Sequence, residues 1–195
     1  MISTRARLVA EHDLILQFLD NVSKAVNGER EGVNLGKKFW IDAVEFIREF
    51  ADGFHHAKEE DLLFPVYCER GLRADFGPVA MMLRDHRMFR TCTERMVSVL
   101  ETSDRVTPKF LADAAEYVNE LRLHIAKENE ILFPMGENLL TSDDENQLQI
   151  RFNEIEDQLG GDDTVKHFQQ LVHSLATRLE KGEVVYPPEF IEVEE

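Results

Sequence analysis

The chain has 195 residues, with 22 Lys or Arg and 38 Asp or Glu, so its formal net charge is −16 at pH 7. This length accommodates a single domain with a full hydrophobic core. The acidity argues against binding to nucleic acids, because contacts with phosphates require a surface rich in Lys and Arg, and against binding to anionic membranes. No apolar run approaches the roughly 20 residues of a membrane-spanning helix.

The beginning of the chain lacks the continuous apolar stretch of a signal peptide. Cys68 and Cys92 are too few for a disulfide framework, although one bridge between them remains an alternative. We therefore expect a cytoplasmic protein with two ordinary thiols.

Apolar residues recur with the helical period along every long segment, and no segment alternates like a strand. Helices are predicted over about residues 4–26, 36–64, 79–100 and 107–133. We expect the first to end at Asn27-Gly28, and the second and fourth to end at Phe64-Pro65 and Phe133-Pro134. The sequence thus predicts an all-α fold, an up-down antiparallel four-helix bundle over residues 1–140 with an additional C-terminal helical appendage.

The appendage, residues 141–195, contains 14 acidic and 4 basic residues and therefore carries most of the net charge. Ser142-Asp143-Asp144-Glu145 has the pattern of a capping box that opens a helix to about Leu159. A further helix is predicted from about Thr164 to Leu179, and the tail from residue 182 is expected to be extended. These helices cannot form a core alone, so we expect them to pack on the bundle.

An internal repeat is the most informative feature of the sequence. Residues 55–65 (HHAKEEDLLFP) align without gaps on residues 124–134 (HIAKENEILFP), and seven of the eleven positions are identical. The two copies lie at the ends of the second and fourth helices, which run parallel in an up-down bundle. The copies should therefore meet at one end of the bundle.

Each copy places a His and a Glu four residues apart, on one face of a helix. Imidazole and carboxylate together suit iron, manganese or zinc. Helical periodicity places His55 on an apolar face but His56 on a solvated one, and the repeat aligns His56 with Ile125. His56 is therefore predicted to lie at the surface or behind a ligand, and Glu59 is preferred over Glu60 for the same reason.

His12 and His86 lie on the apolar faces of the first and third helices. A single His on such a face is more often a hydrogen-bonded core residue than a metal ligand. Two repeats and one inward His on each intervening helix favour a dinuclear site, because burying these groups without a metal would be costly. The candidate ligands are His12, His55, Glu59, His86, His124 and Glu128.

The order of these residues resembles the hemerythrin-like family of HHE cation-binding domains over about residues 5–140. The resemblance implies a left-handed bundle around two iron ions with carboxylate and oxo or hydroxo bridges, and iron is favoured over manganese or zinc. It also implies the same six residues as ligands and a small diatomic or peroxide partner, such as O2, peroxide or nitric oxide. We expect a monomer or a weak homodimer.

The chain departs from the oxygen-carrying hemerythrins at Arg90, where those proteins have a second His on the third helix. Four His and two Glu are similar to the branches that repair iron-sulfur clusters, respond to nitric oxide or sense iron. The alternatives are therefore an enzyme of peroxide or nitric-oxide detoxification or of cluster repair, and an iron or oxygen sensor that acts through its C-terminal extension.

Four further residues are weaker candidates. His167 and His173 could add a ligand, although an amphipathic helix packed outside the bundle is the favoured position for both. Tyr117 lies on the face of His124 and is expected beside the site or in the core. Cys92 lies off the face of His86 and is given no ligand role.

Overall fold

A computed structural model describes residues 2–181, and these residues form helices and loops without any strand. The first helical run is α1 (Thr4–Arg30). The second comprises α2 (Lys37–Glu45), the π-helical segments η1 (Phe46–His56) and η2 (Glu59–Leu63), and α3 (Phe64–Glu69). The third is α4 (Pro78–Thr102). The fourth comprises α5 (Pro108–Lys127), the π-helical segment η3 (Glu128–Leu132) and α6 (Phe133–Glu137).

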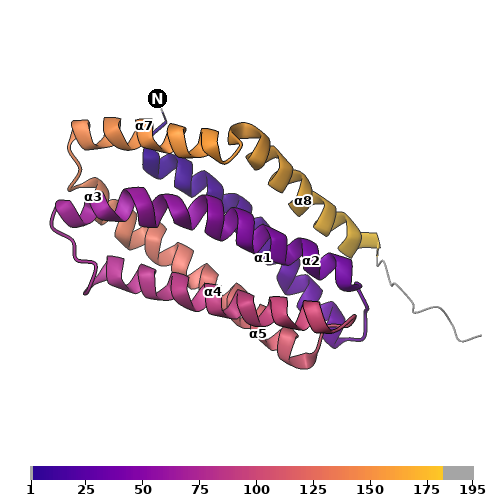
Figure 1. Cartoon of the computed structure of the whole chain (residues 1–195). Coiled ribbons are helices and arrows are strands. Elements are labelled where there is room, and N and C mark those ends of the chain that lie inside the picture. Colours follow the sequence, from indigo (N-terminus) through magenta and orange to yellow (C-terminus); the bar gives the residue numbers. More distant parts are fainter. Residues whose placement is uncertain (1, 182–195) are drawn as a thin grey trace, which may run out of the picture.

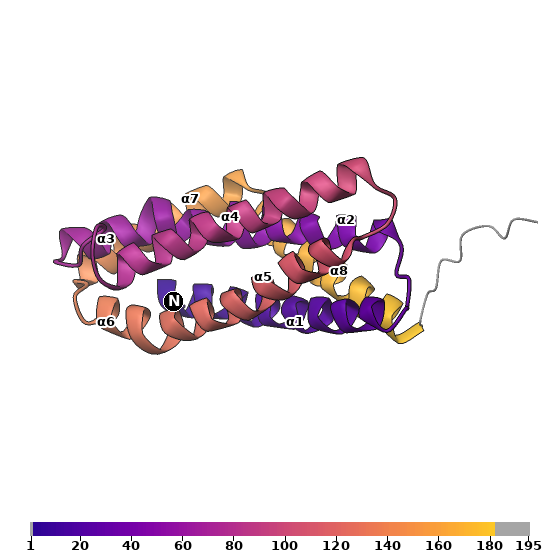
Figure 2. The ribbon, with the colours of Figure 1, turned by 90° about the horizontal axis from the view of Figure 1, so that it is seen from below.

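The four runs lie side by side and alternate in direction (Figures 1 and 2). Helix α5 packs against α1 and α4, α4 packs against α2 and η1, and η1 returns to α1. The ring of contacts is therefore closed, which confirms the predicted all-α bundle. No helix among residues 2–181 has the length and apolarity needed to cross a membrane.

Two further helices, α7 (Ser142–Gln158) and α8 (Gly161–Lys181), run along one side of this bundle (Figure 1). Helix α7 contacts α1 and η2, whereas α8 contacts α1, α2 and η1. Their apolar residues join the bundle core, for example Phe152 from α7 and Val172 from α8. The capping box exists but begins one residue earlier than predicted, between Thr141 and Asp144. The predicted extended tail falls outside the described residues.

Helix α1 continues past the predicted stop at Asn27-Gly28 and ends at Arg30. A glycine inside a helix weakens it but does not end it. The effective stop is Gly32, whose φ of 95° is readily adopted only by glycine. The predicted end of the first helix was therefore wrong by one turn.

Neither Phe-Pro pair ends its helix, contrary to prediction, since the two runs continue to Glu69 and Glu137. Proline cannot donate a backbone hydrogen bond to the turn before it. In each repeat a π-helical segment precedes the proline and widens that turn. The carbonyl of Asp61, four residues before Pro65, instead accepts a hydrogen bond from Arg151 at 3.4 Å. The repeats thus share a π-helical turn before the proline as well as their side chains.

Candidate metal centre

Five histidines and two glutamates meet in the interior of the bundle, and none of them is more than 1% exposed. All six predicted ligands are present, and His56 joins them. Aromatic side chains of two separate hydrophobic clusters enclose the group, since His12 stacks on Phe133 and His124 packs edge-on against Phe89. The seven residues are His12, His55, His56, Glu59, His86, His124 and Glu128.

These residues form two groups, within each of which the possible ligand atoms lie within 4.8 Å of one another. One group contains two histidines, His12 and His55, with Glu59 and Glu128; the other contains three, His56, His86 and His124, with Glu59. The arrangement is therefore asymmetric. An ion in the first group would meet two imidazoles, and an ion in the second would meet three.

Both carboxylates lie between the two groups. The oxygens of Glu59 lie 3.7 Å from His55 Nε2 and 3.5 Å from His86 Nε2. One oxygen of Glu128 lies 3.3 Å from His12 Nε2 and 3.2 Å from His124 Nε2. Each glutamate thus reaches a histidine of either group, which is the position that a bridging ligand requires.

The outward nitrogens of the four predicted histidines face polar side chains in a twofold pattern that follows the repeat. His12 Nδ1 bonds to Asn129 at 2.9 Å, and His86 Nδ1 bonds to the equivalent residue Glu60 at 2.6 Å. His55 Nδ1 bonds to Glu11 at 2.8 Å, while Asp85 lies 3.6 Å from His124 Nδ1. Such partners fix ring orientation and direct the opposite nitrogen, Nε2, toward a metal.

His56 is buried, so of its two predicted positions, at the surface and behind a ligand, the structure excludes the surface; the solvated face that helical counting gave it was wrong. Its face was inferred by counting helical turns of 3.6 residues back through Asp52 and Glu49. Those turns belong to the π-helical segment η1, in which hydrogen bonds span five residues. The wider turns move the face of His56 away from Asp52 and toward Ala51, which is buried. No feature of the sequence marks this change of period.

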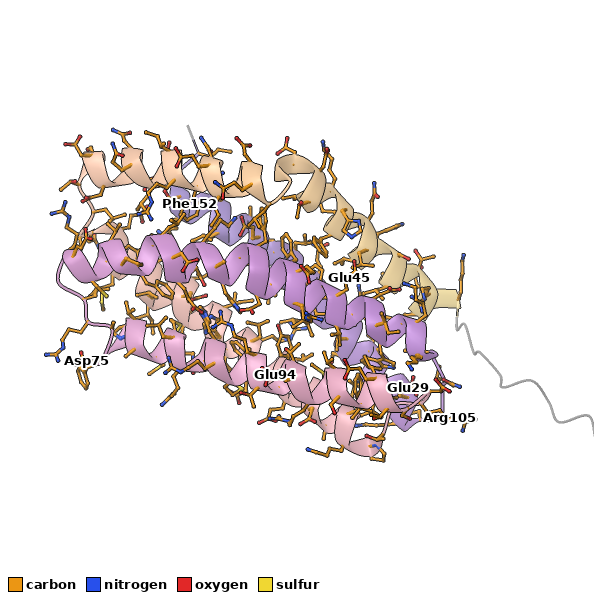
Figure 3. All side chains as sticks on the ribbon, in the orientation of Figure 1. Glu29, Glu45, Asp75, Glu94, Arg105 and Phe152 are labelled. Atoms are coloured by element: carbon orange, nitrogen blue, oxygen red, sulfur yellow. The ribbon has the colours of Figure 1, made fainter. Side chains whose placement is uncertain are left out.

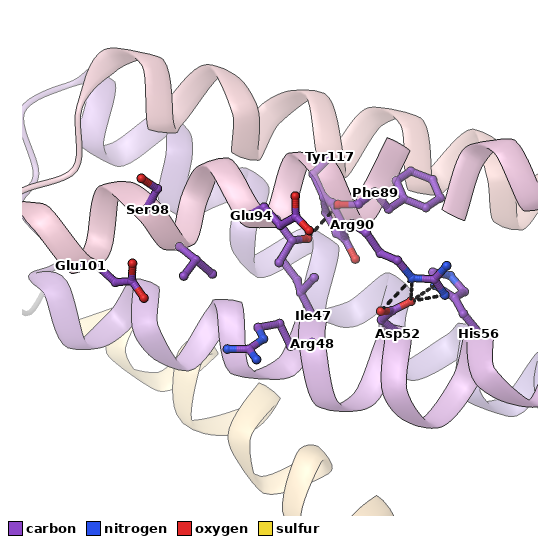
Figure 4. A pocket seen from close by; sticks show the side chains of 12 residues that line it. Ile47, Arg48, Asp52, His56, Phe89, Arg90, Glu94, Ser98, Glu101 and Tyr117 are labelled. Atoms are coloured by element: carbon purple, nitrogen blue, oxygen red, sulfur yellow. Dashed lines mark hydrogen bonds and ion pairs between the residues drawn. The ribbon is translucent and has the colours of Figure 1, made fainter. Parts of the chain in front are cut away.

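Arg90, at the position where a fifth histidine was absent, lies outside the ligand layer. Its guanidinium bonds to Asp52 at 2.8 Å and to Glu60 at 2.7 Å. Asp52 lies 3.5 Å from His56 Nδ1 (Figure 4), and Glu60 bonds to His86 Nδ1, so Arg90 orients the acids behind both histidines. Asp52, His56 and Arg90 form part of the wall of a solvent-open pocket of about 490 Å³ between η1 and α4.

Burial and neighbouring groups shift the pKa values of the buried side chains in both directions. Burial lowers the pKa of His56 to about 3 and the pKa of His55 well below its ordinary value, so both imidazoles are neutral and able to bind metal. Burial and the nearby Glu128 carboxylate raise the pKa of Glu59 well above its ordinary range. Burial also acts to raise the pKa of Glu128, but His124 and His12 outweigh it and lower that pKa.

Several atoms that point inward have no hydrogen-bond partner among the described residues. They are Nε2 of His12, His55 and His56 and both oxygens of Glu59 and Glu128. Buried polar atoms without partners cost free energy, and so many in one place are exceptional. A pair of metal ions would satisfy all of them, so the donor set fits the cofactor that the sequence suggested.

The weaker candidates lie elsewhere. His167 and His173 are exposed on α8, and His167 is 3.5 Å from Glu45, so neither joins the groups. Tyr117 is buried against Phe89 and lines the pocket beside His56. Cys92 is a free thiol whose Sγ bonds to the carbonyl of Asp113. The structure describes no disulfide among residues 2–181.

Comparison with known families agrees with this geometry. The family model described as hemerythrin HHE cation binding domain matches residues 3–136. Comparisons with curated proteins and with solved structures gave no match. The match covers both repeats and every residue of the buried groups, and it ends before α7.

Proposed function

The chain belongs to the hemerythrin HHE cation-binding family, and on that premise we propose that it holds two iron ions and through them binds or reacts with O2, peroxide or nitric oxide. The observation that carries the proposal is the pair of buried donor groups that share Glu59. Cation binding follows from the family; the number and identity of the ions and the small molecule are our inference.

The donor chemistry favours iron. Two imidazoles with carboxylates, as at His12, His55 and Glu128, are the donor set of non-haem Fe(II) sites. The donors are too few to fill six positions around each of two ions when the carboxylates are shared, so positions remain for an external ligand. Bound iron would supply exchange of electrons and of a small ligand; manganese and zinc are the less favoured occupants.

The residues of the chain have separable roles. His12 and His55 would hold one ion, and His56, His86 and His124 the other. Glu59 and Glu128 would join the two positions, because each lies within 4 Å of histidines in both groups. The aromatic side chains around the groups exclude bulk water, which strengthens electrostatic contacts at the site.

The direct test is anaerobic loading with ferrous iron, followed by metal analysis and an absorption spectrum before and after exposure to air. We expect about two iron ions per chain, since the two donor groups each offer several ligands suited to this metal. A visible charge-transfer band should follow oxidation. A His167→Ala variant should load equally, because His167 is exposed and remote from the groups. Protein that stays metal-free and colourless would refute the proposal.

The pocket beside His56 favours a second candidate function, an enzyme that decomposes peroxide or nitric oxide. Arg48, Glu94 and Glu101 lie around the pocket, while His56, Phe89 and Tyr117 line it nearer the buried groups (Figure 4). A solvent-open pocket would let a small substrate exchange repeatedly. Turnover of hydrogen peroxide by the iron-loaded protein, absent in His55→Ala, would support catalysis, whereas reversible O2 binding without turnover would favour a carrier.

A further inference from the structure

The extension helix α7, which lies outside the family match, is connected to the buried groups through Lys58. The Lys58 side chain is fully buried and its ammonium donates hydrogen bonds to Glu11 and, at 2.9 Å, to Glu156 of α7. Glu11 is in turn bonded to His55 Nδ1 at 2.8 Å. A continuous series of polar contacts therefore leads from Glu156 to a candidate metal ligand.

The second repeat contains an equivalent series of histidine, carboxylate and lysine, but no residue of α7 takes the place of Glu156. Lys127, which aligns with Lys58, bonds to Asp85 at 2.5 Å, and Asp85 faces His124. The Lys127 side chain is 32% exposed, whereas that of Lys58 is 0% exposed. The two series are equivalent in sequence, and α7 covers only one of them.

The covered series is also the tighter one. The Glu11 carboxylate lies 2.8 Å from His55 Nδ1, which is a hydrogen bond. The equivalent Asp85 carboxylate lies 3.6 Å from His124 Nδ1, which is too far for one. A buried ammonium requires compensation of its charge. Glu156 supplies it from α7, and Lys58 also lies over the ring of Phe54 at 4.0 Å and near that of Phe152 at 5.6 Å.

Helix α7 is fixed at this point by contacts of its own. Phe152 is fully buried and its label in Figure 3 marks the side of α7 that faces the bundle. Arg7 of α1 donates hydrogen bonds to Glu156 and, at 2.8 Å, to Asn153. Glu156 is therefore held in place and cannot leave Lys58 without breaking contacts to α1.

We propose that Glu156 is a positioning residue for the metal centre, which it controls by holding Lys58 and, through Glu11, His55. The proposal rests on the proposed function, since it concerns how firmly the group containing His12 and His55 binds its ion. The extension thereby sets one of the two metal positions apart from the other. Loss of outer partners of this kind typically weakens metal binding about 10- to 100-fold.

The test compares Glu156→Gln with the matched control Glu154→Gln, an exposed residue of the same helix. Each protein is titrated anaerobically with ferrous iron against a competing chelator. We expect Glu156→Gln to lose about tenfold or more in affinity for one ion and to retain the other, in line with partner loss at other metal sites. Glu154→Gln should match the wild type. Equal weakening in both variants, or none in Glu156→Gln, would overturn the proposal.

A second readout requires no metal. The imidazole N–H signals of His55 and His124 are recorded by NMR in the metal-free proteins. Glu156→Gln should shift the His55 signal and leave the His124 signal in place, because only the first series reaches α7. An unchanged His55 signal would overturn the proposal. Wild-type protein that takes up no iron would refute the proposed function instead. The NMR comparison would then still test whether Glu156 positions His55.

Discussion

The imidazole of His56 stacks on that of His86, with ring centroids 4.0 Å apart and planes inclined by 19°. This contact gives one donor group three histidines although the third helix carries only one, because Arg90 occupies the next turn. The additional imidazole comes from the second helical run. Five histidines and two glutamates therefore lie together although Arg90 stands where the third helix would carry a second histidine.

Replacement of His56 should therefore impair one metal position. We expect His56→Ile, which introduces the residue found at the aligned position 125, to weaken binding of one iron ion by more than tenfold and to spare the other. The physical reason is the loss of one of three imidazoles from one group. Iron titration against a chelator measures the effect, with His173→Ile on exposed α8 as the control. Equal affinities in all three proteins would show that His56 is not a ligand.

The same variant should change how the stability of the metal-free protein depends on pH. The pKa of His56 is lowered by burial to about 3. Below about pH 6.5 its imidazole is therefore protonated in the unfolded chain but stays neutral in the folded one. Lowering the pH from 7 to 5 should therefore cost the wild type about 2 kcal/mol more than His56→Ile. Urea denaturation at the two pH values measures the difference. A parallel decline in both proteins would contradict the lowered pKa.

The two aligned lysines should differ in their contribution to stability. Lys58→Met leaves Glu11 buried beside His55 without its cation, and breaking a buried ion pair in this way costs about 3–5 kcal/mol. In the second pair Asp85 is as buried as Glu11, but Lys127 is 32% exposed, so water screens the pair and Lys127→Met should cost less than Lys58→Met. Urea denaturation of both metal-free variants gives the comparison. Similar costs would mean that α7 does not distinguish the two positions.

Two glycines should respond in opposite directions to alanine. A Cβ atom at Gly136 would lie 2.1 Å from the ring of Tyr67, which is fully buried, so Gly136→Ala should destabilise by about 1–3 kcal/mol through overpacking. A Cβ atom at Gly28, inside α1, would meet Val33 at an ordinary 3.6 Å. Gly28→Ala should therefore stabilise by about 0.5–1 kcal/mol through helix propensity. Thermal unfolding of the two variants decides whether the signs differ.

Much of the fold could be predicted because the helical period is visible over long segments. The errors are confined to places where a local signal was weaker than its context. Pro65 and Pro134 lie in runs that π-helical turns carry onward, and Gly28 is held inside α1 by the turns on either side. Whether a helix continues past such a residue depends on packing and on backbone hydrogen bonding, and neither can be predicted from the residue type alone.

The residues of the candidate site were also predictable only in part. The repeat alone singled out His55, Glu59, His124 and Glu128 as candidate ligands, since identical chemistry recurred at one position of two parallel helices. The structure does not follow the repeat at two places. His56 has no counterpart in the second copy, where Ile125 stands, and Glu156 has none because α7 covers one repeat only.

The sequence by itself determined the helices, the repeat and the six inward-facing donors, because periodicity and spacing are properties of a single chain segment. Only the tertiary structure decided which donors group together and that one group has three histidines. It also decided that a carboxylate 98 residues away neutralises Lys58. Those outcomes depend on the π-helical turns that rotate His56 inward and on the packing of α7 over η2, and both are settled by contacts between segments far apart in the chain.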